Sequence, residues 1–425
     1  MLASGIALIV RRSLKQHALS TLVTVVSVAL ATGLVMAVFC VRQQAHEAFT
    51  GGPIGFDAVL GARGSQLQLV LNTVFHLETS PGNISYKLFK AVQKNPKVEL
   101  AVPYAVGDNL RGFRIVGTSL DLFTKFEYQE GKKFTLAAST TYAPRFFNED
   151  KMEAVVGSYA AQKLGLKVND TFNPYHGLNF DESMKHEEEY RVTGILEPTN
   201  SPSDRVIWIP LEGMYRMKGH VLRDSTGNES EAKPGEAIDD EHKEVSAVML
   251  KLKNPQAGFL LSQEVNRQGK IATLAWPIAT VMSELFDKIG WIDKILELVA
   301  YLVVLVSAGS ILASIYNTMN ERRREFAIMR ALGARRATVF SAIVAEAASI
   351  SALGSVCGYL VYALILGGAA YVIRKETGVV LNVFEFQHVL WAAPLGMTLL
   401  GALSGIVPAL KAYGTDVASN LMPAT

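Results

Sequence analysis

The chain has 425 residues, of which 49% are hydrophobic and only 19% are charged, and its mean hydropathy is +0.22. Soluble domains carry about 25% charged residues, so this composition favours a membrane protein. The formal net charge of +2 argues against the concentrated basic surface of nucleic-acid-binding proteins, and we expect no nucleic-acid partner.

The first apolar stretch covers residues 18–41 and follows three basic residues, Arg11, Arg12 and Lys15. It is longer than the apolar region of a signal peptide, and no small-residue cleavage site follows it, so we expect an uncleaved membrane anchor. Residues 1–17 form a cytoplasmic amphipathic segment. Its central part, residues 6–14, fits either a short helix lying in the membrane interface or an ordinary basic flank.

Residues 42–290 alternate between strand-like and helix-like patterns and predict a large mixed α/β extracytoplasmic domain. The domain contains no cysteine, so burial of its core must stabilise it. Ser158 is the expected N-cap of a short helix that ends at Leu164, with Gly165 beyond it. The predicted strands cover residues 98–102, 112–116, 154–156, 190–196, 205–209 and 245–252, and the predicted helices cover 84–94, 158–164, 254–267 and 277–288, the last continuing without a break into the next apolar stretch.

Four histidines of this domain lie in polar segments. His220 and His242 flank an acidic segment, residues 219–243, which predicts a surface insertion, and His176 and His186 lie in another polar stretch. Histidine and carboxylate side chains are common metal ligands. However, no H-x-H or i,i+4 spacing is present, so solvated surface is the favoured interpretation and no metal site is expected.

Catalytic motifs are absent from the sequence. It contains no phosphate-binding loop, no H-E-x-x-H zinc motif and no G-x-S-x-G nucleophile motif. We therefore expect no catalytic and no cofactor-binding residues.

Three further stretches reach the roughly 20 apolar residues that cross a membrane; they cover residues 291–319, 339–373 and 389–410. Arginines concentrate in the loop 320–338, and Lys411 follows the last stretch. Because basic flanks stay in the cytoplasm, this loop, both termini and the tail 411–425 are expected there, with 374–388 as a short external loop. The predicted fold class is an integral membrane α-helical bundle of four spans with the extracytoplasmic α/β domain.

Small residues in the spans predict close helix packing. Gly354 and Gly358 lie four residues apart in the third span, and Gly401 and Gly405 do so in the fourth. Glu346 lies early in the third span, where a carboxylate is costly. It either ties the cytoplasmic loop to the bundle or is solvated by lipid headgroups.

The most informative segment is the loop from Asn320 to Arg336. A helix is expected over residues 325–332, with Gly333 directly after it. A short helix with apolar and arginine side chains suits docking in a groove of a partner, although its apolar face could instead lie on the membrane. The expected docking residues are Arg324, Glu325, Phe326, Ile328, Met329, Arg330, Leu332 and Gly333.

Residues 321–334, ERRREFAIMRALGA, resemble the signature of FtsX-like, MacB-type ABC transporter permeases. Residues 345–347 resemble the Glu-Ala element of that family. The end of the chain, residues 405–412 and 416–418, resembles the family's tail, although Val417 stands where proline is usual. In the extracytoplasmic domain, residues 155–170 and 190–211 resemble further family segments.

The resemblance implies an inner-membrane permease subunit that has no catalytic activity itself. Two such chains, identical or paralogous, would work with a pair of cytoplasmic ABC ATPase subunits, which would bind ATP and Mg²⁺. Residues 325–332 would be the coupling helix that grips the ATPase. Membrane lipid and a periplasmic adaptor or lipoprotein are the other expected partners.

Two functions follow from the resemblance. In the first, ATP hydrolysis drives movement of the extracytoplasmic domain for export or extraction of a lipophilic compound, a lipoprotein or a peptide. In the alternative, the chain is a scaffold or sensor that activates an extracytoplasmic partner such as a cell-wall hydrolase, without transport.

Overall fold

The computed structural model describes residues 2–50, 55–223, 229–232, 238–377, 381–382 and 385–413. The chain divides into a helical unit, Met1–Ala45, Ile289–Val372 and Leu381–Thr425, and an α/β unit, His46–Lys288 and Ile373–Val380. The tail residues 416–418, and residues 224–228 and 233–237 of the acidic segment, lie outside the described residues.

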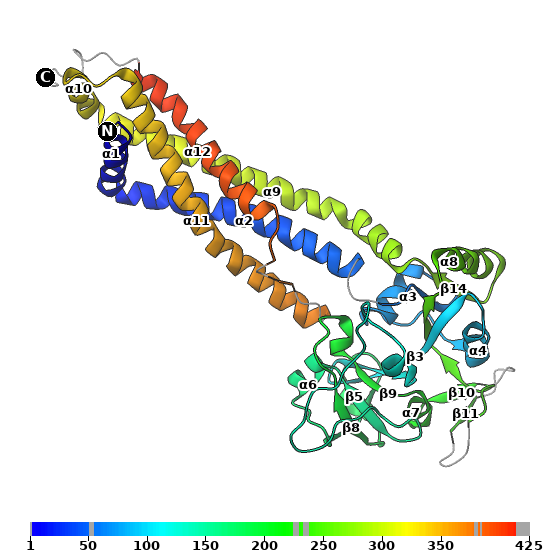
Figure 1. The fold of residues 1–425 in the computed structure, drawn as a ribbon. Coiled ribbons are helices and arrows are strands. Elements are labelled where there is room, and N and C mark those ends of the chain that lie inside the picture. The colour runs from blue at the N-terminus through cyan, green and yellow to red at the C-terminus, as the bar shows by residue number, and fades with distance from the viewer. Residues whose placement is uncertain are drawn as a thin grey trace. The chain divides into compact units, whose positions relative to one another are not determined.

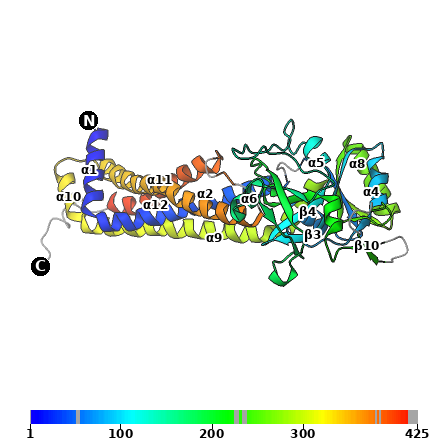
Figure 2. The same cartoon turned by 90° about the horizontal axis from the view of Figure 1, so that it is seen from below.

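Four long helices dominate the helical unit and are long and apolar enough to cross a membrane. Each predicted span lies inside one of them, which confirms the four-span fold class, and each helix extends beyond its predicted span. Figures 1 and 2 show these four helices side by side, with α1 set across one end. The helices containing residues of this unit are α1 (Leu2–Gln16), α2 (Ala18–Thr50), α9 (Ile278–Glu321), α10 (Arg323–Ala331), α11 (Arg336–Thr377) and α12 (Val389–Tyr413).

The predicted glycines lie where these helices cross. A Cβ added to Gly354 of α11 would lie 2.5 Å from Cβ of Val28 and 2.9 Å from the carbonyl oxygen of Val25, both on α2. Gly358 approaches Thr32 of α2 in the same way. Only a residue without a side chain allows backbones this close.

The second glycine pair brings α12 against α11. A Cβ added to Gly405 would lie 2.7 Å from Cβ of Ala347, and Gly401 lies directly against Ser351. Both contact residues belong to α11, so one helix packs against α2 and α12 through separate glycine pairs.

The α/β unit is built on one ten-stranded sheet of order β14-β1-β13-β3-β4-β9-β5-β8-β6, with β7 paired to β3. Pairs β4–β9 and β5–β8 are parallel, and the other pairs are antiparallel. The strands are β1 (Ala58–Ala62), β3 (Val98–Leu110), β4 (Phe113–Thr118), β5 (Glu153–Val156), β6 (Thr171–Phe172), β7 (Tyr175–His176), β8 (Tyr190–Ile195), β9 (Ile207–Pro210), β13 (Ala247–Leu252) and β14 (Ala272–Ala275). Two short ribbons pair β2 (Ile84–Ser85) with β12 (Glu244–Val245) and β10 (Val221–Arg223) with β11 (Glu229–Glu231).

Both faces of the sheet are buried, as the alternation along β9 shows. Ile207 and Ile209 belong to one apolar core, and Trp208 between them belongs to the other. One core includes residues of α4 (Tyr86–Gln93), α6 (Ser158–Leu164), α7 (Leu211–Arg216) and α8 (Pro255–Ser262), and the other includes residues of α3 (Gln66–Thr73), α5 (Asp121–Thr124) and the start of α9. Short 3-10 turns cover Glu182–Met184 and Pro202–Arg205, and a π-helix covers Gln263–Gln268. The mixed α/β class is thereby confirmed.

The predicted N-cap of α6 is wrong by a residue. The N-cap of α6 is Gly157, not Ser158, and it makes no side-chain cap. A Cβ at Gly157 would lie 2.5 Å from the carbonyl oxygen of Asp204, so close approach of a neighbouring turn requires glycine at this position. Gly165 ends the helix in the left-handed conformation, as expected.

Candidate coupling site of the helical unit

Helix α10 occupies most of the segment predicted to be the coupling helix, residues 325–332. It ends in a Schellman motif, in which the Gly333 amide donates to the Arg330 carbonyl and the Ala334 amide donates to the Met329 carbonyl, both at 3.0 Å. Gly333 has a φ of +98°, which side chains rarely tolerate. The glycine therefore fixes the end of the helix and the direction of the following turn.

The two faces of α10 have different surroundings. Phe326 is only 7% exposed and packs in the bundle core, with Met329 partly buried beside it. Ile328 is 45% exposed, and Leu332, the residue directly after α10, is 83% exposed. The expectation that all apolar residues of this helix are available for docking is therefore wrong for Phe326, because that ring is part of the fold.

Arg322, directly before α10, is a buried arginine held by three side chains. Its Nη1 lies 3.4 Å from Oε2 of Glu346 and donates at 2.7 Å to Oγ of Ser13. Its Nε donates at 2.8 Å to Oε2 of Glu325. Ser13 also donates to Glu346. Glu346 is thus paired inside the protein and not solvated by headgroups.

This cluster joins three separate parts of the chain. Ser13 comes from α1, Arg322 from the junction of α9 and α10, and Glu346 from α11. His17 and Glu321 add a second contact, 3.2 Å apart, between the start of the chain and the end of α9. The sequence singled out Glu346 but missed both Ser13 and the buried role of Arg322, because an arginine in a basic loop carries no local signal of burial.

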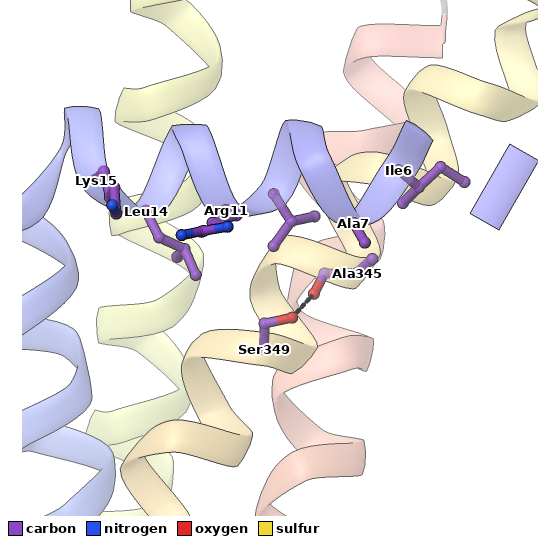
Figure 3. A pocket seen from close by; sticks show the side chains of 8 residues that line it. Ile6, Ala7, Arg11, Leu14, Lys15, Ala345 and Ser349 are labelled. Atoms are coloured by element: carbon purple, nitrogen blue, oxygen red, sulfur yellow. Dashed lines mark hydrogen bonds between the residues drawn. The ribbon is translucent and has the colours of Figure 1, made fainter. Parts of the chain in front are cut away.

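Helix α1 and helix α11 border an open apolar groove of about 560 Å³. Ile6, Val10 and Leu14 line it from α1, and Ala345 lines it from α11. Figure 3 shows Ala7 pointing toward Ala345, with Arg11 and Lys15 on the same helix. Of the two alternatives left open for residues 6–14, a helix is present, and it extends from Leu2 to Gln16.

The histidines of the α/β unit do not all lie in solvent. His186 is buried, and the prediction of solvated surface is wrong for it. His176, His186 and His220 all lie around the fully buried Asp108. Burial would raise the pKa of Asp108, but the three neighbouring histidines hold that pKa below its usual range.

Family models match two parts of this chain. Residues 21–267 match the family described as MacB-like periplasmic core domain, and residues 297–417 match the FtsX-like permease C-terminal family. Curated proteins named "Macrolide export ATP-binding/permease protein MacB" from Mannheimia succiniciproducens and Nitrobacter winogradskyi are 25% and 28% identical over 150 and 148 residues. The aligned segments cover 35% of this chain but only 23% and 22% of those relatives.

Two solved structures resemble the chain in part. The periplasmic region of MacB from Actinobacillus actinomycetemcomitans aligns with 12% identity and a TM-score of 0.31, covering 55% of this chain and 94% of that structure. The extracellular domain of the noncanonic ABC-type transporter YknZ from Gram-positive bacteria aligns with 14% identity and a TM-score of 0.28, covering 51% and 99%.

Proposed function

We propose that this chain couples ATP hydrolysis by a separate ABC ATPase to movement of its extracytoplasmic domain. The proposal starts from the family, since the chain belongs to the MacB/FtsX-type family of ABC transporter permeases. The chain is a membrane subunit of the permease type, with four candidate spans. In this proposal both termini and α10 lie in the cytoplasm, two permease chains work with two ATPase subunits, and ATP and Mg²⁺ bind to the ATPase. The cargo is a lipophilic compound, a lipoprotein or a peptide that is exported or extracted.

The observation that carries the proposal is the two-sided character of α10. Phe326 packs into the bundle, whereas Ile328 and Leu332 are exposed beside arginines. Burying a leucine or isoleucine side chain contributes about 1.5–3 kcal/mol. A groove on the ATPase that covers both side chains would therefore bind α10 favourably. The opposite face of the helix would stay packed in the bundle.

Movement of α10 has a direct route into the bundle. Arg322 joins the helix to α1 and α11 through Ser13 and Glu346. Helix α9 runs without interruption from Ile278, in the α/β unit, to Glu321 next to α10. An unbroken helix is stiff along its axis, which supports mechanical transmission.

The test is capture of the ATPase by variants of the exposed face. Leu332→Asp and Ile328→Asp are each expected to weaken binding of a co-expressed ABC ATPase by roughly tenfold or more, since tenfold corresponds to about 1.4 kcal/mol. Binding is measured by co-purification from detergent and by titration of the purified ATPase. Leu260→Asp is the matched control, because Leu260 is 52% exposed on α8 of the α/β unit.

Full ATPase binding by both α10 variants, equal to that of the Leu260→Asp control, would contradict the docking assignment. Phe326→Asp is unsuitable as a docking probe, because it places a charge in the bundle core and would disrupt folding. Transport of cargo by the reconstituted complex then separates a transporter from an activator of an extracytoplasmic partner, which would hydrolyse ATP without moving cargo.

A further inference from the structure

Four potential metal ligands from four segments of the α/β unit converge on one point. Asp108 comes from β3, His176 from β7, His186 from the segment after the turn Glu182–Met184, and His220 from the segment after α7. Each offers one ligand atom, and these atoms all lie within 4.8 Å of one another. We call these four residues the Asp108 cluster.

The sheet positions the first two members. The register between β3 and β4 shifts between Val106 and Asp108, which is a β-bulge. Strand β7 pairs with β3 so that Asp108 lies opposite His176. Gly177 then donates its amide to the carbonyl oxygen of Gly107 at 2.8 Å, which holds the end of β7 at the bulge.

A buried amide side chain fixes the loop after His176. Nδ2 of Asn109 lies 2.9 Å from the carbonyl oxygen of Gly177 and 3.2 Å from that of Asn179. Asn109 is itself fully buried next to Asp108. The pairing of β7 with β3 and the hydrogen bonds of Asn109, the residue after Asp108, therefore fix the position of His176.

The other two histidines are held by their own backbones. The amide of His186 donates to the carbonyl of Pro174 at 2.9 Å, and the amide of His220 donates to that of Met217 at 3.1 Å. Glu188 links the two segments: its Oε1 accepts the amide of Lys218 at 2.9 Å, and its Oε2 lies 4.0 Å from Nδ1 of His186. At 4.0 Å the Glu188 carboxylate lies beside this imidazole but beyond hydrogen-bond distance.

The distances within the Asp108 cluster resemble those of a coordination shell. Oδ1 of Asp108 lies 3.3 Å from Nδ1 of His176 and 3.2 Å from Nε2 of both His186 and His220. Tetrahedral zinc, with ligands at about 2.0–2.1 Å, holds its ligand atoms about 3.3 Å apart. Oδ1 of Asp108 is thus already at this spacing from one nitrogen of each imidazole, and all the ligand atoms lie within 4.8 Å of one another.

No lysine or arginine balances the charge of the Asp108 carboxylate among the described residues. Asp108 is fully buried. Its Oδ2 and the Nδ1 of His176 have no well-oriented hydrogen bond within the described part of the chain, although both lie close to potential partners. A buried carboxylate is costly unless a cation balances it, and atoms whose lone pairs converge without hydrogen-bond geometry suit a metal ion between them.

We propose that Asp108, His176, His186 and His220 bind one divalent transition-metal ion of the zinc type in the extracytoplasmic domain. Three imidazoles and a carboxylate favour zinc over magnesium or calcium, which prefer oxygen ligands. Four protein ligands fill a tetrahedral shell and leave no open position for substrate, so the site is structural or sensory and not catalytic. The ion clamps the segments carrying His176, His186 and His220 onto the bulge of β3.

Metal content of the full chain tests this proposal. The chain is purified in detergent with an affinity tag that contains no histidine, stripped with chelator and titrated with Zn²⁺ against a chelating dye. We expect one equivalent of tightly bound Zn²⁺, no competition from Mg²⁺, and with Co²⁺ the intense visible absorption of a tetrahedral site. His176→Gln and Asp108→Asn should lose this binding.

His242→Gln is the matched control, because His242 lies in the same domain but outside the Asp108 cluster. His176 is the safest ligand to replace, since its side chain is 42% exposed and contributes little to the core. Gel filtration and the unfolding midpoint in chelator show that each variant is folded. Absence of stoichiometric Zn²⁺ from the wild type, or equal binding by His176→Gln and His242→Gln, would overturn the proposal and leave the cluster as an Asp–His hydrogen-bond network.

Discussion

Arg322→Met is expected to destabilise the helical unit strongly, because it leaves Glu346 as a buried carboxylate. In the wild type Glu346 is paired with Arg322 and accepts a hydrogen bond from Ser13. Without the guanidinium, the hydroxyl of Ser13 is the remaining hydrogen-bond donor to Glu346 among the described residues. Removing one partner of a buried ion pair costs about 3–5 kcal/mol, since the other charge stays desolvated.

Replacing the other partner of the pair, Glu346, should cost less stability. In Glu346→Gln, Arg322 keeps its 2.8 Å hydrogen bond to Glu325, a partly exposed partner, and its contact with Ser13. A lost hydrogen bond to a charged group costs about 1.5–3 kcal/mol. The double variant removes both charges together, so its loss should be smaller than the sum of the single losses by at least about 1 kcal/mol.

The unfolding midpoint of the detergent-purified protein, followed by gel filtration after heating, measures these differences. Arg323→Met is the control, because Arg323 is the exposed neighbour of Arg322. The expected order of stability is Arg323→Met, then Glu346→Gln, then Arg322→Met. Equal stability of the two arginine variants, or strictly additive losses in the double variant, would refute the view that this pair is energetically coupled.

Two further predictions concern the bundle and the α/β unit. Gly354→Leu should push α11 away from α2, because the new side chain would clash with Val28, and should cost about 1–3 kcal/mol of stability. Gly367→Leu on the same helix is the control and should unfold at the wild-type midpoint, because an added Cβ there meets nothing within 4 Å. Similar unfolding midpoints for both variants would contradict the packing of α11 on α2. Arg145 donates to both oxygens of Glu153 at 2.7 and 2.6 Å and holds the pKa of Glu153 below its ordinary value. The stability that this ion pair contributes is present above the unfolded pKa of about 4.3 and is lost as the pH falls through the lower folded pKa. The wild type should therefore be more stable than Glu153→Gln at pH 7 and should lose that advantage in acid. A difference in unfolding free energy that is the same at pH 7 and in acid would exclude the ion pair.

Sequence patterns predicted the features that depend on a continuous apolar stretch or on a helix-ending residue. The four spans follow from apolar length, and the end of α10 follows from Gly333, whose position after a short periodic segment is typical of a helix terminus. The unbroken start of α9 was also predicted. These signals are local, and no tertiary contact can reverse them cheaply.

The orientation of α10 could not be predicted in this way. Apolar residues occupy both of its faces, so helical periodicity alone does not say whether Phe326 or Leu332 faces the bundle. Strand β1 was missed for a related reason: its sequence, AVLGA, contains two alanines and a glycine, which have low strand propensity. Its place inside the sheet comes from pairing with β13 and β14.

The Asp108 cluster was hidden for a topological reason. Its members lie on four segments with no regular spacing, and Asp108 was not singled out because a single aspartate in a long strand carries no metal-binding pattern. The pairing of β7 with β3, and the bulge beside Asp108, bring them together. Two-residue strands such as β7 give almost no periodic signal.

The burial of Phe326 has a consequence for attempts to imitate α10. A synthetic peptide covering this nine-residue helix would be mostly unfolded in water, because helices shorter than about 12–15 residues are marginal alone. It would also expose the phenylalanine ring that the intact protein conceals. Molecules that compete for the same partner surface should therefore copy Ile328 and Leu332 on a rigid frame and omit the aromatic side chain.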